Sequence, residues 1–339
     1  MIFSALKIWL QCRANEWNWS PGWKYRTLLS VQKAKVIRST GSWYRLRTET
    51  GEELSCRLAG QFRAKGIQNT NPVAVGDRVS FSTDGKGTAV IREIESRKNY
   101  LIRKSVNLAK RAQIIAANLD QSLLIVSLVP PRTNYGFIDR FLVTCEAYGI
   151  STHLVVNKSD LHGPEADEEL AYLKKAYRFA GYQVWTVSAH TGKGVDELRA
   201  LMKGQVNLLS GNSGVGKSSL INRLDPSLEL RTQEISAAHQ LGQHTTTFAE
   251  MFPLVSGGDV IDTPGIKSFG LLDMEKPEIG HYFPELFALS ASCRFSNCIH
   301  MEEPGCAVRD AYERQQLAPT RYENYVKILS GEDEESVYR

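Results

Sequence analysis

Short stretches in which apolar and polar residues alternate follow one another after residue 30. Five of them occupy residues 31–39, 43–49, 52–58, 77–83 and 88–96, and turn residues separate them. Alternation with a period of two is typical of β-strands that bury one face. Five strands in fewer than 70 residues predict a small closed barrel, and the five-stranded oligonucleotide-binding (OB) fold is the obvious candidate.

The pattern changes beyond residue 110, where uninterrupted apolar runs alternate with amphipathic helical stretches. Residues 122–129, 152–157 and 183–189 are apolar runs, and residues 165–181 form the longest helical stretch between them. Fully apolar strands are buried on both faces, and strands that alternate with helices form parallel sheets. The pattern therefore predicts a doubly wound α/β domain.

These patterns divide the chain into four regions. Residues 1–30 stay unassigned, and residues 11–30 contain three tryptophans without periodicity. Residues 31–99 form the predicted barrel, residues 110–272 the α/β domain, and residues 273–339 a helical domain. The apolar start lacks a basic stretch and a cleavage site, so no secretory signal is expected. No apolar run approaches the ~20 residues that span a bilayer, so we expect a soluble protein without a membrane partner.

Charge separates the first third of the chain from the rest. Residues 1–111 contain 21 Lys and Arg against 8 Asp and Glu, whereas residues 112–339 contain 20 against 29. A basic barrel with interleaved aromatic residues suits RNA, which offers phosphates and stackable bases. A solvated basic face around an aromatic core remains the alternative. The residues concerned are Arg38, Arg45, Arg47, Arg57, Arg63, Lys65 and Arg78, with Trp43, Tyr44 and Phe62.

A phosphate-binding motif lies between an apolar strand and a helical stretch. Residues 211–218 fit the pattern GxxxxGK[ST], and the strand and helix on either side are those that the motif requires. Its glycines allow backbone N–H groups to wrap phosphates, Lys217 neutralises the outer phosphates, and the Ser218 hydroxyl can coordinate Mg²⁺. The predicted loop comprises Gly211, Asn212, Ser213, Gly214, Val215, Gly216, Lys217, Ser218 and Ser219.

Residues downstream complete a site for the γ-phosphate. Asp262 ends a short apolar strand, where its carboxylate can hold Mg²⁺ through water, and Gly265 can offer a backbone N–H. His244 precedes three threonines, of which Thr246 is assigned to a switch segment. Ile266 stands where Ras-like proteins place a water-orienting glutamine, so unaided hydrolysis should be slow. His244 is the candidate for positioning water, with an ordinary loop residue as the alternative.

A third motif, NKSD, follows the apolar run 152–157 and addresses the base. The carboxylate of Asp160 can accept hydrogen bonds from the ring N–H and the amine of guanine, which adenine does not present in that arrangement. The stem of Lys158 can lie over the ring. The motif therefore predicts GTP rather than ATP. The predicted base pocket comprises Asn157, Lys158, Ser159, Asp160, Ser188 and Ala189.

The order of the motifs is unusual. In Ras-like GTPases the phosphate loop comes first and the base-reading motifs come last, whereas here NKSD precedes the phosphate loop. This order predicts a circularly permuted GTPase, which is feasible because the termini of a doubly wound domain can lie close together. The permutation also makes the switch segment lead directly into the C-terminal domain.

Four potential metal ligands lie within 14 residues near the C-terminus. Cys293, Cys298, His300 and Cys306 provide three thiolates and an imidazole, which suit a closed tetrahedral Zn²⁺ site. Four protein ligands leave no position for a catalytic water, so the predicted role is structural. The remaining cysteines are isolated, and the reducing cytoplasm is the expected compartment.

The basic barrel, the permuted motif order, the segments HTTT and DTPGI, and the cluster CRFSNCIHMEEPGC together resemble the RsgA (YjeQ) family of bacterial GTPases. The resemblance covers about residues 31–330. It implies an OB-type barrel, a permuted GTPase domain and a zinc domain. It further implies GTP hydrolysis in late maturation of the small ribosomal subunit, stimulated by that subunit, with its rRNA and GTP or GDP as partners. We expect a monomer.

Two functions from different classes remain open. In the first, the protein is a GTPase switch that docks on the small subunit and is released by hydrolysis. In the second, it is an RNA-binding assembly scaffold with a structurally bound guanine nucleotide that is scarcely hydrolysed. Ile266 and the absence of an evident arginine finger favour the second. An RNA-independent signalling GTPase is a weaker third.

Overall fold

The first domain is the predicted barrel of five strands. The strands pair in the order β1-β2-β3-β5-β4, and β4 pairs back with β1, which closes the barrel. The strands are β1 (Gln32–Ser39), β2 (Tyr44–Thr48), β3 (Glu53–Leu58), β4 (Arg78–Thr83) and β5 (Ala89–Ile94). Alternate side chains fill the interior, among them Val36, Leu46, Cys56, Phe81 and Ile91.

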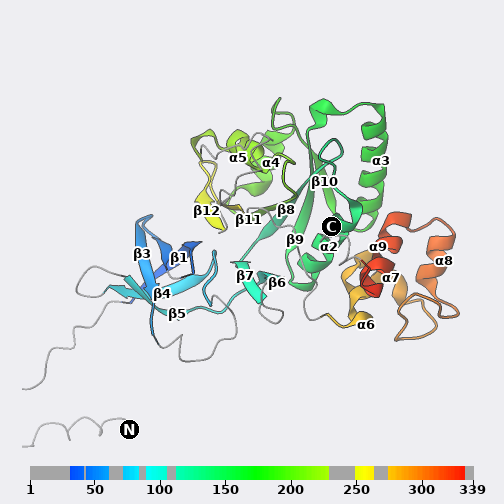
Figure 1. Ribbon diagram of the computed structural model, residues 1–339, viewed down its shortest axis with the longest axis horizontal. Coiled ribbons are helices and arrows are strands. Elements are labelled where there is room, and N and C mark those ends of the chain that lie inside the picture. The colour runs from blue at the N-terminus through cyan, green and yellow to red at the C-terminus, as the bar shows by residue number, and fades with distance from the viewer. Residues whose placement is uncertain are drawn as a thin grey trace, which may run out of the picture. The chain divides into compact units, whose positions relative to one another are not determined.

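The structure is a computed structural model, which describes residues 31–41, 43–60, 72–83, 89–104, 112–228, 249–262 and 274–332 (Figure 1).

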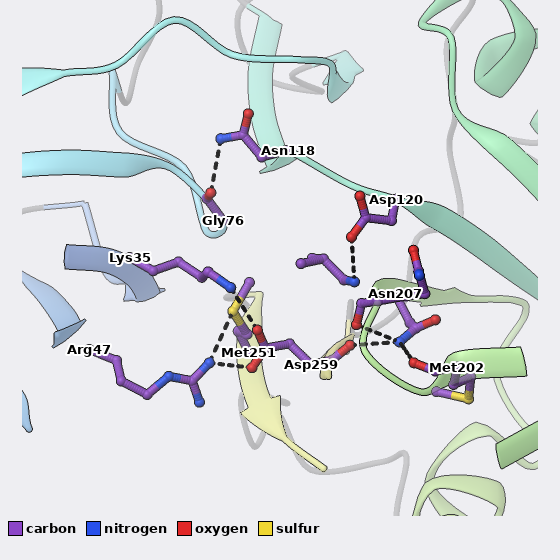
Figure 2. Close-up of polar contacts among 11 residues, drawn as sticks. Lys35, Arg47, Gly76, Asn118, Asp120, Met202, Asn207, Met251 and Asp259 are labelled. Carbon is purple, nitrogen blue, oxygen red and sulfur yellow. Dashed lines mark hydrogen bonds and ion pairs between the residues drawn. The ribbon is translucent and has the colours of Figure 1, made fainter. Parts of the chain in front are cut away.

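A small antiparallel sheet of β6 (Tyr100–Lys104) and β7 (Ala112–Ala117) connects the barrel to the next domain. Asn118 follows this sheet and donates a hydrogen bond from its side chain to the carbonyl oxygen of Gly76 at 3.0 Å (Figure 2). Gly76 has a φ of 92°, and a β-carbon there would lie 2.0 Å from the carbonyl oxygen of Ala117. Glycine is therefore required at this junction.

The second domain is built on six strands in the order β10-β9-β8-β11-β13-β12, and β12 pairs with β1, so that the sheet continues into the barrel. All neighbouring strands are parallel except β12, which runs antiparallel to β13. The carboxyl ends of the parallel strands meet at one edge, where ligands of doubly wound sheets bind. The strands are β8 (Gln121–Ser127), β9 (Ser151–Asn157), β10 (Gln183–Thr186), β11 (Val206–Ser210), β12 (Glu250–Pro253) and β13 (Asp259–Asp262).

Helices cover both faces of this sheet, as the apolar strands predicted (Figure 1). Leu124 and Val126 of β8 pack with α2 and α3, whereas Leu123 and Ile125 point the other way and pack with α4 and α5. The alternation of β8 thus places a core on each face. The helices of the domain are α2 (Tyr135–Ala147), η1 (Ser159–Leu161), α3 (Pro164–Phe179), α4 (Val195–Met202), α5 (Lys217–Leu224) and η2 (Pro226–Leu228).

The C-terminal domain is helical and packs on α2. Val143 of α2 is fully buried in a hydrophobic cluster with Phe283, Leu286 and Tyr325. The elements are α6 (Lys276–Ile279), η4 (Gly280–Tyr282), α7 (Pro284–Ser290), α8 (Ala307–Glu313) and α9 (Pro319–Ser330).

A buried charge network fixes this domain to the α/β domain. Arg321 of α9 is fully buried and contacts Asp139 of α2 at 2.7 Å and Glu285 of α7 at 2.6 Å. Asn324 and Tyr177 donate further hydrogen bonds to the carboxylate of Asp139, at 2.6 and 2.8 Å. A buried carboxylate is tolerated only when it is paired and hydrogen-bonded, so the two domains meet in a single geometry.

Candidate nucleotide-binding site and metal centre

The segment predicted to bind phosphates connects β11 to α5. Gly211, Gly214 and Gly216 have positive φ angles of 147°, 79° and 94°. A β-carbon at Gly211 would lie 2.3 Å from the carbonyl oxygen of Ile125, so no other residue fits there without a shift. Val215 is fully buried and anchors the loop in the core beneath it. The loop precedes a helix N-terminus, where backbone N–H groups attract anions.

Lys217 begins α5 and folds back over this loop. Its ammonium group donates hydrogen bonds to the carbonyl oxygens of Gly211 at 2.6 Å and Asn212 at 2.8 Å. Burial lowers the pKa of Lys217, and the negative charge of Asp262 raises it. A phosphate at the loop would supply the anionic partner that a partly buried ammonium lacks. Of the following serines, Ser218 is half-buried and Ser219 is exposed.

Asn157 ends β9 and ties two loops together. Its amide nitrogen donates a hydrogen bond to the carbonyl oxygen of Val215 in the phosphate loop at 2.9 Å. Its amide oxygen accepts one from the backbone N–H of Ala189 at 3.0 Å. The sequence grouped Asn157 with the base-reading residues, and in the structure its hydrogen bonds are made to the protein. Asn157 thus holds the base loop and the phosphate loop in register.

Asp160 lies in η1 with its carboxylate exposed to solvent. The hydroxyl of Ser188, a fully buried side chain, donates a hydrogen bond to Oδ1 of Asp160. That bond lowers the pKa of Asp160, so the carboxylate is ionised and can act only as an acceptor at neutral pH. The ring N–H and amine of guanine are the donors that such a carboxylate would accept from.

Lys158 adopts a left-handed conformation with a φ of 63°, and Ser159 follows it half-buried. The ammonium group of Lys158 donates a hydrogen bond to the carbonyl oxygen of Pro130, in the loop after β8, at 3.1 Å. Burial lowers the pKa of Lys158. Sequence reasoning missed Pro130 because a backbone carbonyl group leaves no residue-type signal.

Asp262 ends β13 and lies opposite Leu209 of β11 in the parallel register. Because β11 leads directly into the phosphate loop, Asp262 lies beside the start of that loop. Its negative charge raises the pKa of Lys217. The other predicted γ-phosphate residues, His244, Thr246 and Gly265, lie outside the described residues and stay predictions.

The four predicted metal ligands are brought together in the segment between α7 and α8. The ligand atoms of Cys293, Cys298, His300 and Cys306 all lie within 4.8 Å of one another. Nδ1 of His300 lies 3.6 Å from the sulfur of Cys293 and 3.4 Å from that of Cys306. Zinc bonds of about 2.0–2.3 Å in a tetrahedron separate ligand atoms by about 3.3–3.8 Å. The donor set and these distances fit one tetrahedral ion.

Two thiols of this cluster, those of Cys298 and Cys306, are poor acids without a cation. Burial raises the pKa of Cys298 to about 12 and also raises the pKa of Cys306. Metal ligation requires the thiolate form, so binding of the ion releases protons. Cys306 is fixed further by the backbone N–H of Arg309, which donates to its sulfur at the start of α8.

The loop that carries His300 is held by groups that bind no metal. The carboxylate of Glu303 accepts hydrogen bonds from the backbone N–H groups of Ile299 at 2.7 Å and Met301 at 2.9 Å. The hydroxyl of Tyr322 donates to the carbonyl oxygen of His300 at 2.7 Å. These bonds support a φ of 59° at His300, which is uncommon for residues other than glycine. Sequence reasoning missed this role of Glu303, because a carboxylate that binds backbone N–H groups follows no motif spacing.

The outer face of the barrel carries an aromatic–arginine pair. The guanidinium of Arg57 lies 4.0 Å from the ring centre of Trp43, whose side chain is 43% exposed. Tyr44 points inward and belongs to the barrel core, so the core interpretation holds for this residue. Trp43 instead offers a flat apolar surface beside a positive charge, as base-stacking sites do.

Two of the arginines expected to face RNA contact the second domain instead. Arg38 lies 3.6 Å from Glu250, and Arg47 pairs with Asp259. The basic surface left on the barrel is therefore smaller than the charge count suggested. Of the other predicted contacts, Phe62, Arg63 and Lys65 fall outside the part of the chain that the structure describes.

The comparisons with known proteins agree with this arrangement. Residues 33–91 match the family model described as the RsgA N-terminal domain, and residues 94–272 match that of the RsgA GTPase. A relative from Bacteroides fragilis, named small ribosomal subunit biogenesis GTPase RsgA, is 52% identical over 307 residues, which cover 91% of this chain and 99% of the relative. Among the described helices, none has the length and apolarity to cross a membrane.

Two solved structures are similar over most of the chain. YjeQ from Thermotoga maritima superposes with a TM-score of 0.72 at 34% identity, covering 89% of this chain and 98% of that one. YloQ, described as a circularly permuted GTPase, superposes with a TM-score of 0.68 at 27% identity, covering 91% and 97%. The permuted order read from the motifs is thus found in a solved structure.

Proposed function

The chain belongs to the RsgA family of GTPases, and from that premise we propose that it hydrolyses GTP as a switch in late maturation of the small ribosomal subunit. The proposal places it in the cytoplasm, bound to the rRNA of that subunit, with hydrolysis stimulated by the particle. The small subunit enters from the name of the relatives. A monomer remains the expected form.

The observation that carries the GTPase function is the meeting of three motifs at one edge of the sheet. The phosphate loop follows β11, Asp262 ends the neighbouring β13, and Asp160 follows β9. Asn157 links the base side to the phosphate side through Val215. The motifs around Asp160 and Asp262 are weak when taken alone, whereas the assembly of all three in three dimensions supports a site for one guanine nucleotide.

The roles of the residues follow from this arrangement. Asp160 accepts hydrogen bonds from guanine, and the stem of Lys158 covers the ring. Lys217 exchanges its loop carbonyls for the β- and γ-phosphates and stabilises the charge that develops when water attacks the γ-phosphate. Ser218 and Asp262 would hold Mg²⁺, which neutralises negative charge on the phosphates.

Three residues outside the described part of the chain complete the proposal. Thr246 closes over the γ-phosphate, Gly265 donates its backbone N–H to it, and His244 positions the attacking water. The attack forms a bond between the water oxygen and phosphorus and breaks the bond to the bridging oxygen of GDP. Contact with the particle would place this switch over the γ-phosphate, so the free protein should turn over slowly.

The flanking domains hold the protein on the particle in this proposal. Trp43 and Arg57 on the barrel suit a stacked base, and Arg45 adds charge on the same strand as Arg47. The cluster of Cys293, Cys298, His300 and Cys306 would hold one structural Zn²⁺ ion, which orders the segment before α8. The fit of its interatomic distances to a tetrahedral site supports zinc.

The test is GTP turnover by the full chain, alone and with isolated small ribosomal subunits, at one fixed salt concentration. We expect the subunits to accelerate turnover by about tenfold or more, which is about 1.4 kcal/mol of barrier. Lys217→Ala should abolish turnover in both conditions and serves as the background control. Subunits that bind without accelerating hydrolysis would favour the assembly scaffold. The base pocket is tested separately by Asp160→Asn, which should lose the preference for guanine nucleotides.

A further inference from the structure

The barrel touches the GTPase domain through a small cluster of charges. Asp259, the first residue of β13, accepts hydrogen bonds from Lys35 of β1 at 2.8 Å and from Arg47 of β2 (Figure 2). Arg47 also lies 3.7 Å from the sulfur of Met251 on β12. Beside this cluster, Arg38 of β1 is the cross-strand partner of a β12 residue. Two strands of the barrel thus meet the β12–β13 hairpin.

Asp259 is built into the strand that ends at the proposed Mg²⁺ ligand. β13 contains only four residues, with Asp259 at one end and Asp262 at the other. The carbonyl oxygen of Asp259 accepts a hydrogen bond from the buried side chain of Asn207 on β11 at 3.0 Å, and its N–H donates to Gln205. A displacement of Asp259 therefore moves both β13 and its register against β11, the strand that leads into the phosphate loop.

The three charges differ in how far they are exposed to solvent. Asp259 is 10% exposed and Arg47 15%, whereas Lys35 is 31% exposed. Nη1 of Arg47 is buried without a hydrogen-bond partner among the described residues. The carboxylate is thus removed from water and depends on its two cations, while Lys35 remains within reach of an anion from solvent.

A neighbouring ion pair provides an internal comparison. Lys33 lies two residues before Lys35 on β1 and pairs at 2.8 Å with Glu95, which belongs to the barrel side of the chain. The side chain of Lys33 is 67% exposed against 15% for Arg47, and both members of the Lys33–Glu95 pair belong to the barrel region. The same strand therefore holds one ion pair within the barrel and one between domains.

We propose that Lys35, Arg47 and Asp259 form a coupling joint through which the barrel positions Asp262, so that these three are positioning residues for GTP hydrolysis. A partner bound to the basic barrel would move Lys35 and Arg47, and with them β13 and its terminal carboxylate. The inference rests on the proposed function, because it names how the barrel's partner would regulate the nucleotide site. The physical connection is β13, which runs from Asp259 at the joint to Asp262 at the nucleotide site.

The test is a double-mutant cycle on the full chain, with Asp259→Asn, Arg47→Gln and the combination. Single-turnover GTP hydrolysis is measured with saturating small subunits across a Mg²⁺ titration. Each single variant should lower the maximal rate by about tenfold and raise the Mg²⁺ concentration needed for half of that rate. Because the two residues act through one contact, the combination should be no slower than the slower single variant. Lys33→Gln is the matched control and should leave both quantities unchanged.

Several outcomes would overturn the joint. One such outcome is that the rate losses of the two single variants multiply in the combination, because independent losses of stability combine in that way. Single variants within about twofold of the parent rate would also contradict it. Lys35→Gln, which removes the more exposed cation, guards against misfolding and should shift the Mg²⁺ requirement in the same direction by less. If the parent chain is not stimulated by subunits, the proposed function fails, and the joint is then judged from the Mg²⁺ dependence of unstimulated hydrolysis.

Discussion

The two domain junctions of the chain use charges in opposite ways. At the C-terminal junction, Arg321 is buried between Asp139 and Glu285. A hydrophobic cluster that includes Val143 of α2 packs at the same junction. At the barrel junction, Asp259 is buried but its cations remain partly exposed. The first junction has every carboxylate oxygen of Asp139 bonded, whereas the second leaves a guanidinium nitrogen of Arg47 unsatisfied.

The difference separates a structural junction from an adjustable one. A buried and fully bonded network is strongly destabilised when one member leaves, so it holds one geometry. A partly exposed ion pair is weakened by salt and can be broken by a competing anion at small cost. We therefore expect the C-terminal domain to stay fixed on α2. The barrel junction is the one that can shift when a partner binds.

The largest effect is expected from loss of a metal ligand on the fixed side. Cys298→Ser leaves three ligands, and a structural zinc site contributes on the order of 10 kcal/mol to the fold that it closes. We expect near-complete loss of zinc by elemental analysis and loss of helical signal from α8 and α9. Ser296→Ala, in the same exposed segment, is the control and should keep one zinc ion per chain. Full zinc content in the Cys298 variant would mean that the ligand set is wrong.

The next effect tests the buried network directly. Arg321→Met leaves Asp139 and Glu285 buried without their cation, which should lower the free energy of unfolding by about 3–5 kcal/mol. Urea denaturation measures this change. Arg45→Ala, which breaks an exposed pair with Glu53 within the barrel, should cost less than about 1 kcal/mol. A similar cost for both variants would remove the distinction between the junctions.

A smaller effect on stability is expected at the barrel junction. Arg47→Gln leaves Asp259 with Lys35 as its remaining cation, so the cost should be about 1–2 kcal/mol, between those of the buried and exposed pairs. The same urea series measures it. A cost equal to that of Arg321→Met would make the barrel junction as rigid as the other.

The smallest effect is a difference in salt response. Raising the salt from about 0.05 to about 0.5 M should reduce the stability cost of Arg47→Gln by roughly half, because screening already weakens the pair in the parent chain. The cost of Arg321→Met should stay constant, because that network excludes water and ions. Parallel salt dependence of the two costs would contradict the assignment.

Much of the fold could be predicted from local patterns. Alternation located the barrel strands, apolar runs located the parallel strands, and the GxxxxGK[ST] and cysteine–histidine spacings located two sites, because each depends on residues close in sequence. The closed barrel and the doubly wound sheet confirm these predictions. The cluster of Cys293, Cys298, His300 and Cys306 is also assembled as its spacing indicated.

The contacts that join the domains left no such signal. Arg321 and Asp139 are 182 positions apart, and Arg47 and Asp259 are 212 apart. Charged residues at such separations are indistinguishable from solvated ones until the fold brings them together. For this reason Arg38 and Arg47 were grouped with the residues expected to face RNA, although both contact the second domain. The carbonyl group of Pro130 escaped notice because any residue could supply it.

The most direct test of the adjustable junction is hydrogen exchange of the full chain with and without small ribosomal subunits. Binding at the barrel should change the exchange rates of the β12 and β13 amides, residues 250–262, by about tenfold, because their register depends on Asp259. The amides of α9 and of α2 near Asp139 should keep their rates. Unchanged exchange in β12 and β13, or equal changes at both junctions, would contradict the account.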